Sequence, residues 1–196
     1  MVTFDFDRAR HVYRLDGSII PSLSEILRPI TERIYSQVPD QDVLEAAKLR
    51  GTQAHLDTEL FDKGEADEYT SPYAEGWAKF RRSTGFEPTH IEHSTYHTGL
   101  KYGTTIDRLG VLPDGTKVLL DIKTGQFSSW HKLQTAGQAL ALATHGLCRP
   151  DVARIGVLLT VEGVKGDYKI VDHDYEGDLE FFRHWTRVQQ EKWRYE

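Results

Sequence analysis

The segment Tyr102–Gly125 reads YGTTIDRLGVLPDGTKVLLDIKTG, with two largely apolar runs on either side of one turn signal. The turn signal, Pro113-Asp-Gly115, predicts a three-residue hairpin loop whose glycine adopts the left-handed conformation. Strands joined by such a loop pair in a fixed register. In that register Asp107 lies directly opposite Asp121.

This pairing predicts a charged site on an otherwise apolar sheet. Side chains in a strand alternate between faces, so Asp121 and Lys123 project from the same face, about 6.6 Å apart along the strand. Two opposed carboxylates destabilise a strand pair by less than about 1 kcal/mol even when exposed. A divalent cation between Asp107 and Asp121 would remove that repulsion. An Asp-x-Lys pair alone is more often an ordinary solvated pair, and the opposed Asp107 favours a functional site.

A second turn signal, Thr98-Gly99, predicts that another strand precedes this hairpin. A two-residue turn there would place Glu92 opposite Thr105, which in turn faces Lys123. The same register would place His90 in the row of Asp107. We therefore expect Glu92, Asp107, Asp121 and Lys123 to share one face of a three-stranded sheet.

Helical patterns dominate the chain before residue 88. Residues 12–21 resemble two short strands around Asp16-Gly17, and Ser22 or Ser24 is expected to cap a short helix that ends before Pro29. A longer helix is expected from an Asp40 cap to Lys63-Gly64, weakened by Gly51 in its middle. A further helix is expected between the Ser71-Pro72 cap and Gly85.

Strands and helices alternate after residue 88. The expected elements are strands at about 89–97, 101–112 and 116–123, a helix from Ser128 or Ser129 to Gly146, strands at 153–161 and 168–172, and a closing helix over roughly the last 20 residues. This order predicts an α/β fold, more strictly a mixed α+β sheet, mostly antiparallel and then mixed, flanked by helices. We expect one domain over 1–196, with an N-terminal lead-in at 1–39 and a core at 40–196.

Composition excludes several classes of protein. The chain has 196 residues, a net charge of −6 and a single cysteine, Cys148, which excludes an intramolecular disulfide and a four-cysteine metal site. Any metal must bind to oxygen and imidazole ligands. No run approaches the roughly 20 apolar residues of a membrane helix, and the N-terminus lacks a signal-peptide pattern. We therefore expect a cytoplasmic protein without a membrane partner.

The order of several short motifs resembles a known family. Residues Arg50-Gly-Thr-Gln-Ala-His55, Gly103-Thr-Thr-Ile-Asp107-Arg108, Asp121-Ile-Lys123-Thr-Gly125 and a following helix with Gln134 are similar to the RecB-like branch of the PD-(D/E)XK nucleases. The segment Tyr13–Leu27 resembles the lead-in of phage and prophage exonucleases of this branch. The resemblance implies a restriction-endonuclease-like core.

The resemblance also implies roles for individual residues. His55, Asp107, Asp121 and the main-chain carbonyl of Ile122 would bind one or two Mg²⁺ or Mn²⁺ ions, ligands that suit these cations. Lys123 would orient or deprotonate the attacking water. Glu92 matches a glutamate frequent in this branch and is expected at the catalytic centre or on its substrate side. Glu59, one helical turn after His55, could hydrogen-bond the imidazole or reach a second metal, although a solvated surface position is equally consistent with its acidic surroundings.

Substrate contacts are expected on the neighbouring strand and helix. Gln134 and Gln138 face one way on a helix, and Gln138 replaces a tyrosine common in this branch, so Trp130 or Tyr102 would supply an aromatic face instead. Thr105 and Arg108 complete the expected substrate-binding set. The structural alternative is that Trp130 and its helix only pack against the core.

The leading hypothesis is a metal-dependent DNA exonuclease of phage or bacterial recombination and repair, in the cytoplasm of a bacterial or phage-infected cell, with a single-strand annealing protein as a conceivable partner. A structure-specific endonuclease, a nuclease fold that binds DNA without cutting, and a hydrolase of small phosphate esters remain alternatives. Polarity, strand preference and oligomeric state are left open.

Overall fold

The computed structural model describes residues 2–36, 41–173 and 175–194. Its elements are β1 (Phe4–Asp7), β2 (Val12–Leu15), β3 (Ser18–Ile20), α1 (Leu23–Tyr35), α2 (Gln41–Asp62), α3 (Pro72–Thr84), β4 (Glu87–His97), β5 (Tyr102–Val111), β6 (Lys117–Thr124), α4 (Trp130–Thr144), β7 (Ala153–Glu162), β8 (Lys165–Asp172) and α5 (Glu176–Trp193). Within the described residues, no helix has the length and apolar character needed to cross a bilayer.

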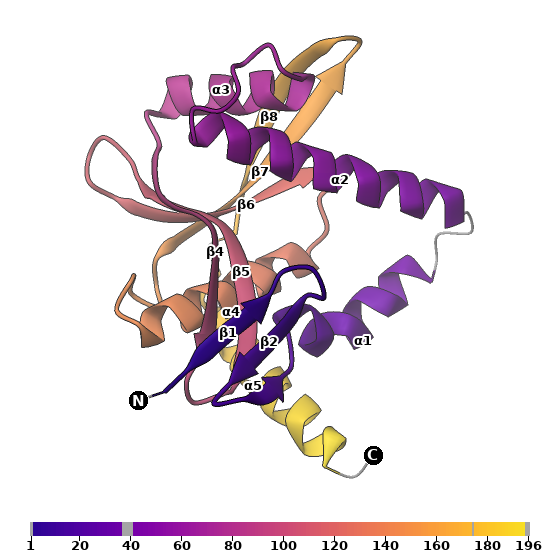
Figure 1. Cartoon of the computed structure of the whole chain (residues 1–196), viewed down its shortest axis with the longest axis vertical. Coiled ribbons are helices and arrows are strands. Elements are labelled where there is room, and N and C mark those ends of the chain that lie inside the picture. Colours follow the sequence, from indigo (N-terminus) through magenta and orange to yellow (C-terminus); the bar gives the residue numbers. More distant parts are fainter. Residues whose placement is uncertain (1, 37–40, 174, 195–196) are drawn as a thin grey trace.

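The body of the molecule is a five-stranded mixed sheet flanked by helices (Figure 1). The strand order is β4-β5-β6-β7-β8, and every neighbouring pair is antiparallel except β6 and β7. The chain crosses from β6 to its parallel neighbour β7 through α4, as a parallel pair requires. The fold class is therefore mixed α+β, with an antiparallel meander followed by one parallel connection, as the sequence predicts.

Two apolar clusters hold helices against opposite faces of this sheet. On one face, Trp77 and Phe80 of α3 and Ala54 of α2 pack with Leu120 and Ile122 of β6. On the other face, residues of α4 pack with Leu109 of β5 and Leu119 of β6. Helices α1 and α5 then pack against α4. Because β6 contributes to both clusters, it lies at the centre of the molecule.

The hairpin between β5 and β6 has the register predicted from its turn. Leu112 donates its N–H to the carbonyl of Thr116 over 2.9 Å, and Gly115 has φ of 86°. Val111 pairs with Lys117 and Arg108 with Leu120. Continuing this register by one residue sets Asp107 opposite Asp121.

The register predicted between β4 and β5 is wrong by two residues. His97 pairs with Tyr102, so the connection has four residues, and Thr105 faces Ser94 instead of Glu92. The cause is the His97 imidazole, whose Nδ1 accepts the N–H groups of Gly99 and Leu100 over 3.1 and 3.0 Å and closes the longer loop. A slip of two preserves the strand faces and brings Glu92 level with Asp107.

The predicted end of the first helix, before Pro29, is also wrong. Helix α1 continues through Pro29 to Tyr35. Pro29 is exposed, so water can solvate the carbonyl that loses its helical partner, while the buried Ile26 and Leu27 hold the helix on α4. Helix α2 is continuous across Gly51, and its expected Asp40 cap lies outside the described residues.

The lead-in forms a separate three-stranded sheet, ordered β1-β2-β3, of which β1 was not predicted although Phe4-Asp-Phe-Asp7 alternates. The hydroxyl groups of Tyr13 on β2 and Thr105 on β5 are hydrogen-bonded at 2.9 Å. Gly103 of β5 lies so close to Tyr13 that a Cβ atom would clash with the ring. The small sheet is therefore fitted directly against β5.

Candidate active site

The candidate site lies in the middle of the β4–β5 pair, where the β5–β6 ladder ends. The paired residues Ile91–Arg108 and His93–Ile106 flank Glu92 and Asp107, and Glu92 has φ of 46°, a conformation that residues other than glycine seldom adopt. The Asp107 carboxylate accepts a hydrogen bond from the N–H of Ile122 over 2.6 Å. This side-chain contact takes the place of the next backbone hydrogen bond between β5 and β6. This interruption turns Glu92 and Asp107 toward α2.

Helix α2 supplies the third group. The Nδ1 atom of His55 lies 3.4 Å from Oε1 of Glu92 and 3.8 Å from Oδ1 of Asp107. One ligand atom from each of these three residues lies within 4.8 Å of the others, the one such group found among the described residues. An imidazole and two carboxylates at this spacing are a suitable donor set for Mn²⁺ or Mg²⁺.

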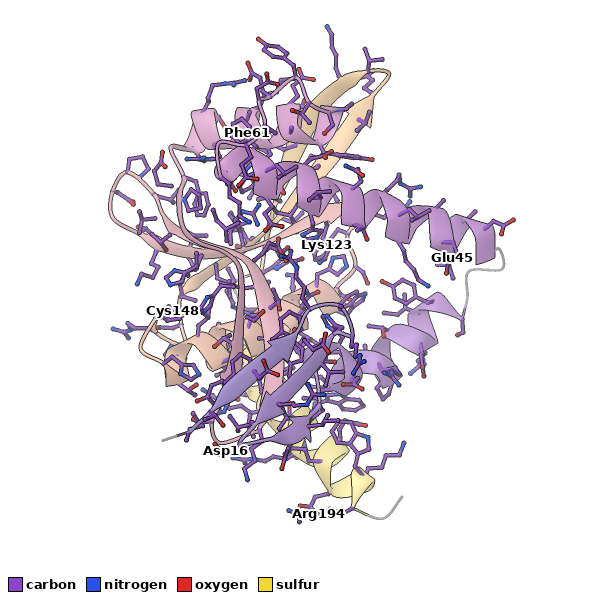
Figure 2. All side chains as sticks on the ribbon, viewed as in Figure 1. Asp16, Glu45, Phe61, Lys123, Cys148 and Arg194 are labelled. Atoms are coloured by element: carbon purple, nitrogen blue, oxygen red, sulfur yellow. The ribbon has the colours of Figure 1, made fainter. Side chains whose placement is uncertain are left out.

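Asp121 and Lys123 form the adjoining half of the site at the end of β6. The Lys123 ammonium donates to Oδ1 of Asp121 over 2.6 Å, and the Gln134 amide donates to the same oxygen over 3.0 Å. The other oxygen, Oδ2, is buried and has no hydrogen-bond partner. A buried carboxylate oxygen without a partner is costly, and a bound cation would satisfy it. Figure 2 shows Lys123 close to the end of β6, below α2 in this view.

Ile122 directly follows Asp121 in the chain and is hydrogen-bonded to Asp107. Its N–H binds Asp107, and its side chain is buried under α2 and α3. The backbone at this residue is therefore fixed at the site. A role for its carbonyl as a metal ligand stays a prediction.

The charges in the site shift its pKa values. Burial raises the pKa of Asp121 to about 6, against the opposing effect of Lys123. Burial lowers the pKa of Lys123, but the carboxylates of Asp121 and Asp107 outweigh it and raise the pKa above its usual value. For His55, burial lowers the pKa, whereas Asp107 and Glu92 raise it, with a net rise. Asp121 and His55 therefore keep a proton to a higher pH than usual, and a metal ion bound by them would compete with that proton.

Arg108 is buried between the sheet and helices α2 and α3, next to the site, and is not exposed to substrate. Its guanidinium has no exposed surface and donates to Oε1 of Glu92 over 3.0 Å and to Oδ2 of Asp62 over 2.6 Å. It also lies over the Trp77 ring, 5.6 Å from the centroid. The expected contact between Arg108 and substrate is therefore not met in this conformation. Its position instead fixes the Glu92 side chain.

The other residues expected to bind substrate divide into two groups. Gln134 lies at the site, where its amide donates to the Asp121 carboxylate. Gln138 is buried and donates to the Thr105 carbonyl over 3.1 Å. The Thr105 hydroxyl is engaged by Ser94 and Tyr13. Gln138 and Thr105 therefore join α4 and the lead-in sheet to β5, and a contact of either with substrate stays a prediction.

Among the aromatic residues, Trp130 is partly buried against the α1–α4–α5 cluster, which agrees with its structural alternative. Tyr102 is fully buried and donates to the Gly137 carbonyl over 2.6 Å, so it offers no stacking face. Tyr35 of α1 makes an edge contact with Trp130, 6.4 Å between centroids, and is 42% exposed. No motif in the sequence predicts a role for Tyr35.

Glu59 and His90 also differ from expectation. Glu59 binds Arg8 and Lys63 over 3.1 and 2.6 Å. His90 pairs with Leu109 and contacts the His93 ring, because the β4–β5 register differs from the predicted one.

Asp62, which no sequence motif predicts, is a buried partner of Arg108. Its side chain has no exposed surface and accepts from Arg108, from Arg81 over 3.1 Å and from the Trp77 indole over 2.9 Å. Its position seven residues after His55, two helical turns along the same face, was the available signal.

No protein-family model and no curated protein sequence matches this chain.

Proposed function

We propose that this protein is a metal-dependent DNA exonuclease with a PD-(D/E)XK core of the RecB-like branch. The observation that carries the proposal is the meeting of His55, Glu92 and Asp107 beside the Asp121–Lys123 pair. The three-stranded meander β4-β5-β6 is followed by the crossover helix α4 and by the parallel strand β7. This is the order that the resemblance implies. The motif order in the sequence is what favours DNA over other phosphodiesters.

In this proposal His55, Asp107 and Asp121 hold one or two Mg²⁺ or Mn²⁺ ions, with Glu92 beside them. Such ions supply a water of lowered pKa and stabilise negative charge on a phosphodiester. Gln134 holds the Asp121 carboxylate in place from α4. Arg108 does the same for Glu92 from its buried position against α2 and α3.

Lys123 accepts the proton of the attacking water. Its high pKa in the structure has an identifiable cause, the negative charges of Asp121 and Asp107. When those charges are neutralised by a metal ion that the carboxylates hold, the remaining effect of burial lowers the pKa of Lys123 toward the range of a general base, so that its ammonium releases a proton to solvent before the amine takes one from water. The ammonium that results then lies next to the charged phosphate.

The proposal is tested by incubating end-labelled linear DNA with the protein, with Mg²⁺, with Mn²⁺ or with EDTA. We expect progressive release of short products that requires the metal and is lost in Asp121→Asn, but not in Asp151→Asn, which alters an exposed carboxylate paired with Arg149. Absence of any cleavage of linear, nicked or single-stranded DNA by the wild type would overturn the proposal.

Three further assays separate the alternatives. A closed circular substrate is cut by an endonuclease and resists an exonuclease. A chromogenic phosphodiester would reveal a hydrolase of small esters. DNA binding without cleavage would identify a non-cutting relative. As an exonuclease of this type the protein would act in the cytoplasm of a bacterial or phage-infected cell, beside a single-strand annealing protein.

A further inference from the structure

The turn between β1 and β2 presents an exposed basic tip. It consists of Arg8, Ala9, Arg10 and His11, all of them exposed. The side chains of Arg8 and Arg10 are 71% and 77% exposed. The Asp7 carboxylate accepts the N–H of Arg10 over 3.0 Å and thereby fixes the turn. The hairpin tip therefore holds its two guanidinium groups on an ordered backbone.

Two contacts place the hairpin tip beside the candidate active site. Arg8 donates to Glu59 of α2 over 3.1 Å, and Glu59 follows His55 by one helical turn, about 6 Å along the axis. Behind the tip, Tyr13 binds Thr105, two residues before Asp107. Figure 1 shows the β1–β2 hairpin in front of β4 and β5, with its turn directed toward α2. The hairpin is thus attached to α2 and β5, two of the elements that carry the proposed metal ligands.

The hairpin tip also has positive charge left over after these contacts. The Glu59 carboxylate is shared by two cations, Arg8 and Lys63. Arg10 lies 3.8 Å from Asp7, an exposed pair that is weak in water. Three cations therefore face two carboxylates at this edge of the site. Guanidinium groups bind phosphate oxygens in a two-pronged geometry and are weakly hydrated, which suits transient contact with a nucleic-acid backbone.

We propose that the hairpin tip binds the backbone phosphates of the DNA strand that enters the active site, with Arg10 as the principal contact. This proposal rests on the proposed function, because it takes DNA as the substrate. It gives the lead-in sheet a role in substrate binding that is separate from catalysis. An acidic peptide is the competing occupant of such a tip.

The test is the salt dependence of DNA binding, measured in Ca²⁺ or EDTA so that no strand is cut. Each phosphate contact contributes about 0.7 to 0.9 to the slope of log affinity against log salt concentration. We expect Arg10→Gln to reduce that slope by about this amount and to weaken binding roughly fivefold near 0.1 M salt. Arg149→Gln is the matched control, since Arg149 is exposed, pairs with an aspartate nearby and lies beyond the opposite end of α4 from Gln134.

The outcomes distinguish this proposal from the proposed function. If the slope is reduced in Arg10→Gln alone, the hairpin tip binds DNA phosphates. That result holds even if the protein cleaves no DNA with any metal, in which case only the proposed hydrolytic function fails. Equal slopes in wild type, Arg10→Gln and Arg149→Gln would overturn the proposal that the hairpin tip binds DNA phosphates, without affecting the proposed nuclease function. Failure of the wild type to bind DNA, or a poly-glutamate chain that competes as well as DNA, overturns it too.

Discussion

Asp121 shows how one buried carboxylate couples metal binding to protons. Its Oδ1 atom has two donors, whereas its buried Oδ2 has none, and burial raises its pKa to about 6. In the unfolded chain the same group titrates near 4. The folded protein therefore retains this proton at a pH where the unfolded chain has released it.

A comparison of wild type with Asp121→Asn isolates this effect. Because the folded pKa is raised, the contribution of Asp121 to stability is fully present below about pH 4 and is lost as the pH rises through about 6. We expect the free energy of unfolding of wild type, relative to the variant, to fall by on the order of 3 kcal/mol over that range. Urea unfolding in EDTA at several pH values measures it. A difference that does not change with pH would contradict the assignment.

Lys123 can be tested by a substitution that keeps its charge. Arginine at this position remains positive but cannot release a proton. If Lys123 is the base, Lys123→Arg and Lys123→Met both lose at least about 100-fold in cleavage rate. Single-turnover kinetics with saturating Mn²⁺ measures the chemical step. Substantial activity in the arginine variant alone would show that only the charge is required.

At the scale of elements, a strand register is predicted correctly from the sequence only where the turn that joins the two strands is predicted correctly. Pro113-Asp-Gly115 specifies its own loop, so the β5–β6 register is confirmed. The β4–β5 loop depends on the His97 side chain, which composition does not reveal. Pro29 indicates a helix end by local propensity, yet tertiary packing of α1 overrides it.

The candidate site was predictable to the extent that strand geometry defines it. Asp107, Asp121 and Lys123 follow from one hairpin, whereas the approach of His55 from α2 follows only from the family resemblance. The buried role of Arg108 depends on Asp62, which lies 46 residues away in sequence. Long-range pairs of this kind leave no local pattern.

The Asp62–Arg108 pair joins α2 to β5, and we expect Asp62→Asn to destabilise the protein by about 3 to 5 kcal/mol, because it leaves the fully buried Arg108 guanidinium with Glu92 as its one remaining carboxylate partner. Glu45→Gln is the control on the same helix, since Glu45 and Lys48 form an exposed pair. That change should alter stability by less than about 0.5 kcal/mol. Urea unfolding at neutral pH compares them, and similar effects would show that the buried pair adds nothing.

For the whole molecule, metal binding and folding should be linked. Mn²⁺ at about 100 times its dissociation constant stabilises a folded protein by about 2.7 kcal/mol, or about 5 to 10 °C in Tm at this size. Because the pKa values of Asp121 and His55 are raised, protons compete with the metal, and the Tm increase should grow from pH 5.5 to about 7.5. Thermal unfolding measures it. An equal increase in Asp107→Asn would place the metal elsewhere.

Helix α5 closes the structure from the far end of the chain. The Trp185 indole donates to the Ile26 carbonyl of α1 over 2.8 Å, and Gln190 binds the Leu100 carbonyl beside β5. Domains form as the ribosome delivers them, from the N-terminus onward. A nascent chain that has just emerged through β7 already carries all the proposed catalytic groups, but α5, which packs against α1 and α4, has not yet been made. During synthesis the catalytic residues are therefore made first, and the last contacts to the N-terminal segment form only when α5 is complete.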